Sequence, residues 1–248
     1  MSNKRIKTDI NFLEYPCHIV NYKSKERRLL KIETKRGIYT LASAVNNRLP
    51  SSKDRVILYY FIKELAKNDF ENRKIITNRY KVSKEIWNAV SGRYYKMIID
   101  ALTRYSNLTA TFENVFYMGK KYKKRIFHFI ESFDFLENGE LLVVFNENFV
   151  NQLKNTNYYR LVNYNEIKKL RSNVSIRLYE YLLKQSFPFK IGLVKFGKKL
   201  TLSDNKLYES TILPILNRTI KEVNLKTSLS VKFEYNKKNK VFTFFEFF

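Results

Sequence analysis

One amphipathic helix occurs twice in this sequence, and the repetition restricts the fold more than any other feature. The stretches SKDRVILYYFIKEL (52–65) and SNVSIRLYEYLLKQ (172–185) have the same hydrophobic phase and lie about 120 residues apart. The matching positions are Leu58 with Leu178, Tyr59 with Tyr179, Phe61 with Tyr181, and Ile62 with Leu182. A helix repeated in this way indicates two copies of one small domain.

A second match follows the first in the same order. The stretch IIDALTRYSNLTATFE (98–113) superposes on TIKEVNLKTSLSVKFE (219–234), with the hydrophobic residues in phase. Each copy is then predicted to run helix, short helix, long helix and β-hairpin. This is the order of the winged helix-turn-helix, in which the third helix enters the major groove and the hairpin, or wing, reaches the flanking backbone. We therefore predict an α+β fold with two tandem winged-helix domains related by internal duplication.

The domain boundary is expected next to NTNYY, which gives an N-terminal domain of residues 1–155 and a C-terminal domain of residues 156–248. Residues 9–50 are predicted to form strands and turns, including an extra β-hairpin around Gly37. Ser51 and Asp54 give a capping signal for the first helix. The other predicted helices are 76–83, 83–107 with a break near Gly92, 146–154, 165–186, 195–201 and 207–224. The other predicted strands are 108–119, 125–136, 140–145, 191–194, 228–235 and 241–248.

The charge of the chain is strongly positive. Lys and Arg number 47 against 23 acids, a formal net charge of +24, and the pI is about 9.9. The excess is spread evenly, because residues 156–248 carry 18 basic and 7 acidic side chains and residues 1–155 carry 29 and 16. A field of this sign favours a polyanion, with nucleic acid first and an anionic membrane second.

Both predicted wings have cationic tips, and this is the clearest functional signal in the sequence. The first tip is GKKYKKR (119–125) and the second is NKKNK (236–240). We predict that these tips hold phosphates, together with the third helix of each domain, where Arg and Asn suit base edges. The candidate DNA-binding residues are Lys84, Asn88, Ser91, Arg93, Tyr94 and Lys96; Lys120, Lys121, Lys123, Lys124 and Arg125; Lys206, Tyr208, Ser210, Thr211, Asn217, Arg218 and Lys221; and Lys237, Lys238 and Lys240.

Other chemistries find little support. GLVKFGKK (192–199) has the skeleton of a phosphate-binding loop, but Lys199 stands where a Ser or Thr would hold magnesium. The two histidines, His18 and His128, are 110 residues apart, so the paired histidines of a nicking enzyme are missing. No carboxylate cluster with metal-ligand spacing occurs. We therefore expect no catalytic residue, no metal and no cofactor.

Cellular location is predicted from the same composition. Cys17 is the single cysteine, so neither an intramolecular disulfide nor a cysteine-based metal site can form. The longest purely apolar run is LLVVF (141–145), far shorter than the ~20 residues of a membrane helix. The chain also opens without a signal-peptide pattern. We expect a cytoplasmic protein that does not contact a membrane.

With these residues in view, the chain resembles the winged-helix plasmid replication initiators of the Rep or RepA type. SNVSIRLYEYLLKQ resembles the family's segment with Ser followed by RLYE-LLK, and IKEVNLKTSLSVKFEY resembles its segment that joins the recognition helix to the wing. NFLEYP (11–16), DRVILYYFIKEL and GRYYKMIIDALTRYSNLTATFENVFYMGKKY (92–122) resemble first-domain segments, so the likeness covers roughly residues 10–248.

The resemblance implies a function that composition alone does not show. Such initiators bind directly repeated origin sequences, called iterons, through both domains, help to open the adjacent DNA, and recruit the host initiator and helicase machinery. Many also form homodimers through the N-terminal domain, and they act without a catalytic site of their own. The alternative that the sequence leaves open is a dimeric winged-helix transcriptional repressor that opens no DNA; a nicking enzyme is a third and weaker hypothesis.

Overall fold

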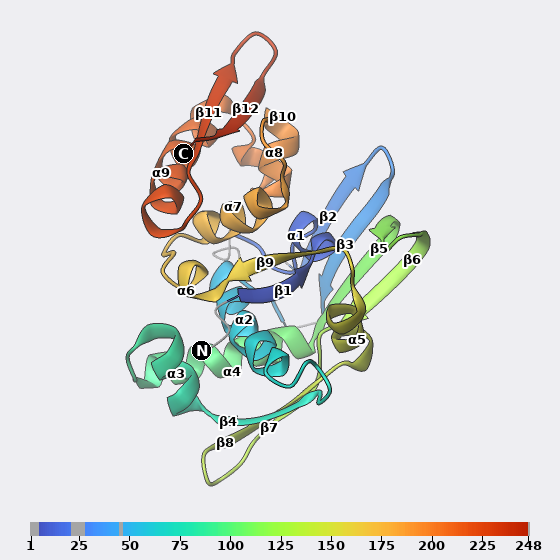
Figure 1. Cartoon of the computed structure of the whole chain (residues 1–248), viewed down its shortest axis with the longest axis vertical. Coiled ribbons are helices and arrows are strands. Elements are labelled where there is room, and N and C mark those ends of the chain that lie inside the picture. Colours follow the sequence, from blue (N-terminus) through green and yellow to red (C-terminus); the bar gives the residue numbers. More distant parts are fainter. Residues whose placement is uncertain (1–4, 21–27, 45–46, 248) are drawn as a thin grey trace.

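The computed structural model describes residues 5–20, 28–44 and 47–247. It shows two stacked units, with the C-terminal unit above the N-terminal unit in the view of Figure 1. Both mix helices with small antiparallel sheets, so the fold is α+β with two winged-helix domains, as the sequence predicted.

The C-terminal unit is a complete winged helix. Its helices are α7 (Asn173–Lys184), α8 (Leu193–Lys199) and α9 (Glu209–Lys226), and a short 3-10 turn, η1 (Asp204–Lys206), precedes α9. Its strands are β10 (Phe189–Gly192), β11 (Val231–Asn236) and β12 (Val241–Glu246). They form a sheet in the order β10-β12-β11, with the β11–β12 hairpin as the wing. Both the long third helix and this hairpin confirm the sequence prediction.

The N-terminal unit repeats this plan. Its helices are α2 (Ser52–Ala66), α3 (Arg79–Trp87) and α4 (Gly92–Ser106), and its strands are β4 (Lys74–Asn78), β7 (Ile130–Phe135) and β8 (Glu140–Phe145). The sheet order is β4-β8-β7, which matches β10-β12-β11 strand for strand. The wing of this unit is therefore the β7–β8 hairpin, whose turn spans residues 136–139.

This sheet order corrects the predicted position of the first wing. The hairpin of β5 (Leu108–Tyr117) and β6 (Lys121–His128) is inserted between α4 and β7. It joins β2 (Leu29–Thr34) and β3 (Gly37–Ser43) in a separate sheet, in the order β2-β3-β5-β6. β5 follows α4 directly and alternates in burial, as a wing strand would, so only its pairing partner β3 shows that it belongs elsewhere.

Several element boundaries also differ from the prediction. Residues 76–78 end β4, and the second helix begins only at Arg79. The expected single strand 125–136 is two strands in different sheets, β6 and β7. The expected strand region at 9–50 contains a short helix, α1 (Ile10–Glu14), whose first turn is capped by Asp9. The helix expected at 165–186 is divided into α6 (Tyr164–Ile167) and α7.

Other expectations are confirmed. Ser51 and Asp54 form a reciprocal capping box at the start of α2, so two otherwise free amide donors of the first turn are satisfied. β2 and β3 form the expected extra hairpin. α5 (Glu147–Asn155) matches the helix predicted at 146–154. The division at residues 155 and 156 stays a prediction: just beyond it, β9 (Tyr159–Asn163) pairs with β1 (Arg5–Asp9) from the start of the chain.

The core of the N-terminal unit is largely aromatic. Phe12 of α1 is 1% exposed and has its ring centroid 5.2 Å from that of Phe127 and 5.6 Å from that of Phe149. Phe112 of β5 lies 6.0 Å from the same ring. Edge-on contacts of this kind add to the free energy of apolar burial. Phe12 lies before the winged helix in sequence but packs in its core. The N-terminal segment therefore supports the fold of this unit.

A buried charged group joins the two units. We call it the Glu180 cluster, and it consists of His18, Arg55, Tyr59, Arg177 and Glu180. The Arg55 guanidinium donates to Glu180 over 2.9 Å, and the Tyr59 hydroxyl donates to the same oxygen over 2.6 Å. Burial alone would raise the pKa of Glu180, but the surrounding charges and the Tyr59 hydroxyl lower it below its usual range. Glu180 is therefore a carboxylate inside the protein.

His18 is uncharged although it lies among charged groups. Its Nε2 atom lies 3.5 Å from Glu180, a geometry that would suit an ion pair. Complete burial, however, lowers the pKa of His18 to about 3, with Arg55 and Arg177 acting in the same direction as burial and Glu180 against it. His18 is therefore neutral at physiological pH, and its contact with Glu180 is not an ion pair.

This burial predicts a dependence of stability on pH. Below about pH 6.5 the unfolded chain protonates His18 while the folded chain does not, so the free energy of unfolding should fall by up to about 1.4 kcal/mol per pH unit as the pH approaches 3. Denaturant unfolding at pH 7, 6 and 5 measures this slope. His18→Asn should flatten it, whereas the same change at the exposed His128 should not. Equal slopes in all three proteins would contradict the assignment.

Candidate nucleic-acid interface

The third helix of the C-terminal unit, α9, presents one exposed stripe to solvent. Its opposite face is buried through Ile212, Leu216 and Val223, so the helix cannot rotate on the domain. The exposed positions recur at helical spacing and include two of the predicted cations and one predicted amide. They are Ser210, Pro214, Asn217, Arg218, Lys221 and Leu225. An exposed helix face of this composition can contact base edges and phosphates together.

The remaining predicted residues of this region lie near the start of α9. Lys206 belongs to η1, and Tyr208 is the residue before the helix, with 63% of its surface exposed. Thr211 is half-buried in the first turn. The predicted helix of residues 207–224 contained Tyr208 and Thr211, with Lys206 directly before it, whereas in the structure α9 begins at Glu209 and both Lys206 and Tyr208 precede it. They flank the exposed stripe and do not extend it.

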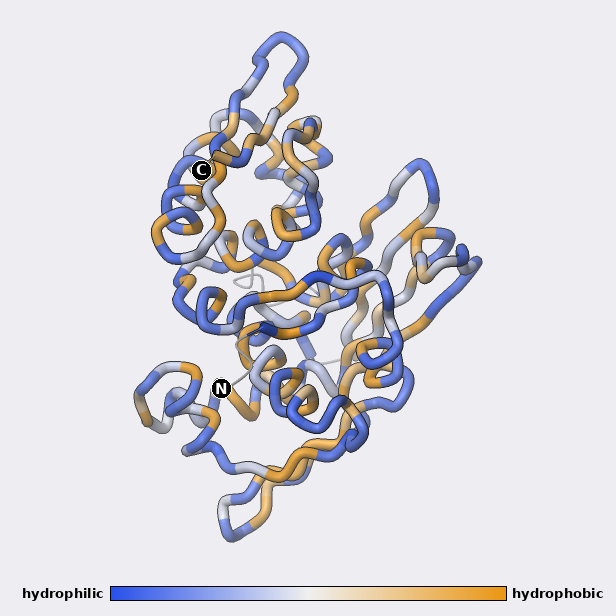
Figure 2. The backbone as a smooth tube through the Cα atoms, in the orientation of Figure 1, coloured by the Kyte–Doolittle hydropathy of each residue, from blue (hydrophilic) through white to orange (hydrophobic). Residues whose placement is uncertain are grey.

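The β11–β12 turn carries the second predicted cationic tip. Lys237, Lys238 and Lys240 are exposed at the upper end of the molecule, and Figure 2 shows the turn as a hydrophilic stretch. Lys240 has a φ of 51°, which closes the turn, and its carbonyl accepts a hydrogen bond from the Leu193 amide at the start of α8. In the described part of the chain, no carboxylate pairs with these three lysines. Their charge is free for an external anion.

The exposed positions of α4, the third helix of the N-terminal unit, all lie near its start. Ser91 accepts a hydrogen bond from the Tyr94 amide and caps the helix, while Arg93 and Lys96 are exposed beside it. Further along, the helix is buried through its apolar face. Lys84 lies on α3, and Asn88 ends that helix with a left-handed backbone, φ 52°. The structure therefore separates these two residues from the third helix, where the sequence had placed them.

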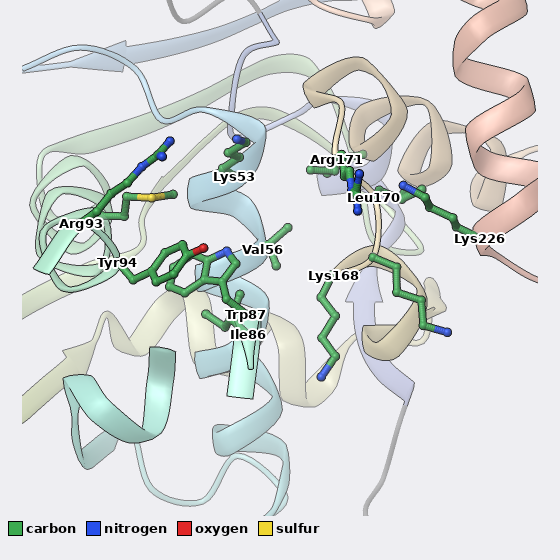
Figure 3. Close-up of a pocket in the computed structure, with 13 residues that line it drawn as sticks. Lys53, Val56, Ile86, Trp87, Arg93, Tyr94, Lys168, Leu170, Arg171 and Lys226 are labelled. Carbon is green, nitrogen blue, oxygen red and sulfur yellow. The ribbon is translucent and has the colours of Figure 1, made fainter. Parts of the chain in front are cut away.

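A basic groove lies between the two units (Figure 3) and was not predicted. Its cavity volume is about 750 Å³. Trp87 and Tyr94 stack at 4.5 Å on one wall, with Lys53 and Arg93 near them and Arg171 and Lys226 across the groove. The cations that line it are Lys53, Arg93, Lys168, Lys169, Arg171 and Lys226. Within the described residues, no carboxylate pairs with Lys53, Arg93, Lys169 or Arg171.

The segment that carries Arg171 is fixed to α9 by one carboxylate. Glu222 accepts hydrogen bonds from the Arg171 amide over 2.7 Å and from the Ser175 hydroxyl over 2.7 Å. Partial burial would raise the pKa of Glu222, but these hydrogen bonds and that from Lys226 lower it to about 2. The run KKLR (168–171) is the sequence signal that could have indicated this surface.

The inserted β5–β6 hairpin lies on the other side of the molecule. In Figure 1 its tip points away from the side where α3 and α9 lie. Lys120, Lys121 and Lys123 are exposed there, Lys124 lies 3.4 Å from Glu113, and Arg125 packs over the Tyr122 ring. The structure thus does not bring these five residues together with the other predicted residues.

The true wing of the N-terminal unit has the opposite charge. β7, β8 and their turn carry four acids and no base: Glu131, Asp134, Glu137 and Glu140. The β11–β12 wing carries lysines in the same topological position. A phosphate backbone is attracted by one wing and repelled by the other.

Two further features bear on chemistry. GLVKFGKK is mostly helix α8, and Lys199 is buried in an ion pair with Glu14, so its amino group is not free for phosphate. In the parts of the chain that the structure covers, no group of three or more metal-ligating side chains comes together. In the same parts, no helix is both long and apolar enough to span a membrane.

Comparison with known proteins agrees with this geometry. The family model described as initiator replication protein, WH1, matches residues 20–183, which is more than half of the chain. The crystal structure of domains 2 and 3 of RctB is similar, with a TM-score of 0.66 at 15% identity, covering 96% of this chain and 98% of that one. The Pi initiator protein in complex with iteron DNA has a TM-score of 0.58 at 14% identity, covering 79% and 90%. No curated protein matches the sequence significantly.

Proposed function

The chain belongs to the initiator replication protein family, and on this premise we propose that it binds duplex origin DNA sequence-specifically through both winged helices. The observation that supports this best is the set of exposed cations without a carboxylate partner among the described residues. They lie on α9, in the basic groove and at the start of α4: Arg218, Lys221, Lys53, Lys169, Arg171 and Arg93. Neutralised phosphates release counterions, so such a set favours a nucleic-acid duplex over other anions. The fold of the Pi initiator, which was solved with iteron DNA, supports the same proposal.

The contacts divide by chemistry. On α9, Asn217 and Arg218 are suited to base edges, because an amide and a guanidinium can each form two parallel hydrogen bonds. Lys221 and the three lysines of the β11–β12 turn are suited to phosphates, which set position without reading sequence. In the N-terminal unit, Arg93 and Lys96 fill the corresponding place at the start of α4. The other predicted residues stay candidates for weaker or flanking contacts.

Because the β7–β8 wing is acidic, the two units contact DNA in different ways. Glu131 pairs with Arg73, but the other three carboxylates of this wing have no cationic partner among the described residues. Because they repel phosphate, we propose that the N-terminal unit contacts DNA through α4 and the groove, without its wing. The C-terminal unit uses both helix and wing. Most of the sequence preference should then come from residues 156–248.

At the level of biology, we propose a cytoplasmic initiator that binds iterons, promotes opening of the adjacent DNA and recruits the host initiator and helicase machinery. Dimerisation through domain 1–155 and the division from domain 156–248 are part of this proposal. The chain would act without catalytic residue, metal or cofactor. The alternative is a winged-helix repressor that binds as a dimer and opens no DNA.

Replacing Lys237, Lys238 and Lys240 by Ala should weaken binding to specific and random duplexes alike. The slope of log K against log salt should fall by about 0.9 for each phosphate that the variant no longer neutralises. Fluorescence anisotropy over a salt series measures this slope. The matched variant Lys120→Ala/Lys121→Ala/Lys123→Ala removes equal charge from the β5–β6 hairpin: a smaller change would place that hairpin outside the duplex site, and an equal change would place both on DNA. An unchanged slope in the first variant would remove the wing from the interface.

Arg218→Ala should lower sequence preference instead. Removing a bidentate hydrogen-bonded pair costs about 1–3 kcal/mol against the preferred site, with little change on random DNA. Competition between selected and random duplexes measures the difference. Equal losses of affinity for both would show that Arg218 binds only phosphate.

Origin opening separates the initiator from the repressor. With the plasmid or chromosome region that carries the selected repeats, the initiator should make thymines of an adjacent segment reactive to permanganate, while a repressor should protect DNA without new reactivity. The same supercoiled DNA should stay uncut in the presence of Mg²⁺ or Mn²⁺. Nicked product would instead support the hypothesis that the protein is a nicking enzyme.

A further inference from the structure

We propose that the Glu180 cluster is a positioning device, which fixes the spacing and helical phase at which the two winged helices contact DNA. The inference rests on the proposed function, because it assigns a cause to the geometry of that same site. None of the cluster residues reaches the surface, so they act on DNA only through the helices that they hold.

The third helix of each unit, α4 or α9, is fixed to the first helix of the same unit, α2 or α7. In the N-terminal unit, Arg104 of α4 donates to Asp54 of α2 over 2.8 Å, and both side chains are nearly buried. In the C-terminal unit, Glu222 of α9 accepts from Ser175 of α7 over 2.7 Å. Any movement of α4 relative to α9 therefore requires a movement of α2 relative to α7.

α2 and α7 pack directly on each other, and the Glu180 cluster lies at their contact. Arg55 comes from α2 and Glu180 from α7, and their side chains are 2% and 0% exposed. Tyr59 of α2 adds its hydroxyl to the same carboxylate, and the Arg55 guanidinium lies 4.2 Å from the Tyr59 ring. Both helices thus contribute charged groups to one buried contact.

The ion pair also restricts sliding of α2 along α7. Apolar helix surfaces can slide by small steps with little change in buried area, whereas a buried ion pair allows one register only. A shift of one helical turn would leave the Glu180 carboxylate and the Arg55 guanidinium without partners in a low-dielectric interior, which is strongly destabilising. Buried polar groups are best documented in this role of fixing register.

Arg177 extends the same constraint to two further segments. Its guanidinium donates to the Leu13 carbonyl over 2.7 Å and to the Lys199 carbonyl over 2.8 Å. α1 and α8 are thereby fixed to α7 at the cluster. Other contacts between the units differ in depth. The Lys168 ammonium on the Glu85 carbonyl at 3.0 Å lies near the surface, whereas the Glu14–Lys199 ion pair is largely buried and supports the same arrangement beside the cluster.

A fixed angle between the units predicts a sharp optimum in the spacing of the DNA site. Each inserted base pair moves the two half-sites apart by about 3.4 Å and rotates them by about 34°. If the two units cannot move, only one of them can contact its half-site on the altered duplex. The protein then loses the gain in affinity, about 100-fold or more, that comes from binding through two linked units. A protein whose units can shift gives up less of this gain.

The test begins with the duplex that the wild-type chain selects from a random library, extended by one to five base pairs between the segments that each unit protects. The main variant is Arg55→Leu/Glu180→Leu, because apolar replacement of a whole buried pair often preserves stability. The affinity of the wild-type chain should fall about 100-fold by the two-pair insertion, and that of the variant less than about tenfold. Tyr59→Phe, which removes one hydrogen-bond donor to Glu180, should broaden the spacing optimum to an intermediate degree. This variant replaces the double variant in the test if the double variant does not fold.

Gln152→Leu is the control, since it removes a buried hydrogen bond to Asp9 inside one unit, between residues outside α2, α4, α7 and α9. It should lower thermal stability and keep the sharp spacing optimum. The inference is overturned if folded Arg55→Leu/Glu180→Leu and Tyr59→Phe proteins keep the wild-type optimum, or if Gln152→Leu broadens it equally. Failure of the wild-type chain to select any duplex would instead overturn the proposed function.

Discussion

The rest of the structure depends on the burial of one carboxylate. Glu180 has no exposure, and its charge is stable there only because Arg55, Tyr59 and Arg177 surround it. An ion pair removed from water contributes little net stability but tolerates no missing partner. The chain must therefore bring helices from both units and the segment around His18 to one point. The stacking of two winged helices into one body follows from this requirement.

The sequence predicted local structure well and one distant pairing wrongly. Helical phase, the Ser51–Asp54 cap and the β11–β12 hairpin are set by neighbouring residues, so the pattern was enough to find them. The first wing was wrong because β5 and β11 both follow a third helix and both alternate in burial. Both form a hairpin with the strand that follows, β6 or β12. What distinguishes them is the second neighbour, because β5 also pairs with β3 whereas β11 is the edge strand of its sheet. That choice is made by tertiary packing, which no short window of sequence contains.

The same distinction explains the candidate interface. The exposed stripe of α9 could be predicted from one helix, and Asn217, Arg218 and Lys221 do lie on it. Lys84 and Asn88 were misplaced because α3 runs on to Trp87 and is ended by the left-handed Asn88, whereas the second helix was expected to stop at residue 83; the break expected near Gly92 does precede α4. The basic groove was missed because its cations come from α2, from α4, from the segment after α6, and from the end of α9. Each of them is ordinary in its own part of the sequence, and only the contact between the units assembles them.

The unequal wings have a further consequence for how copies arrange themselves. The lysine-bearing turn of β11–β12 and the acidic turn of β7–β8 are at opposite ends of the long axis in Figure 1. The two ends of the long axis therefore carry opposite local charge, although both units are net positive. Two copies in the same orientation along a line bring these unlike ends together, whereas two copies related by a two-fold axis bring like ends together. If the chain binds DNA as proposed, this asymmetry favours tandem sites over a palindrome.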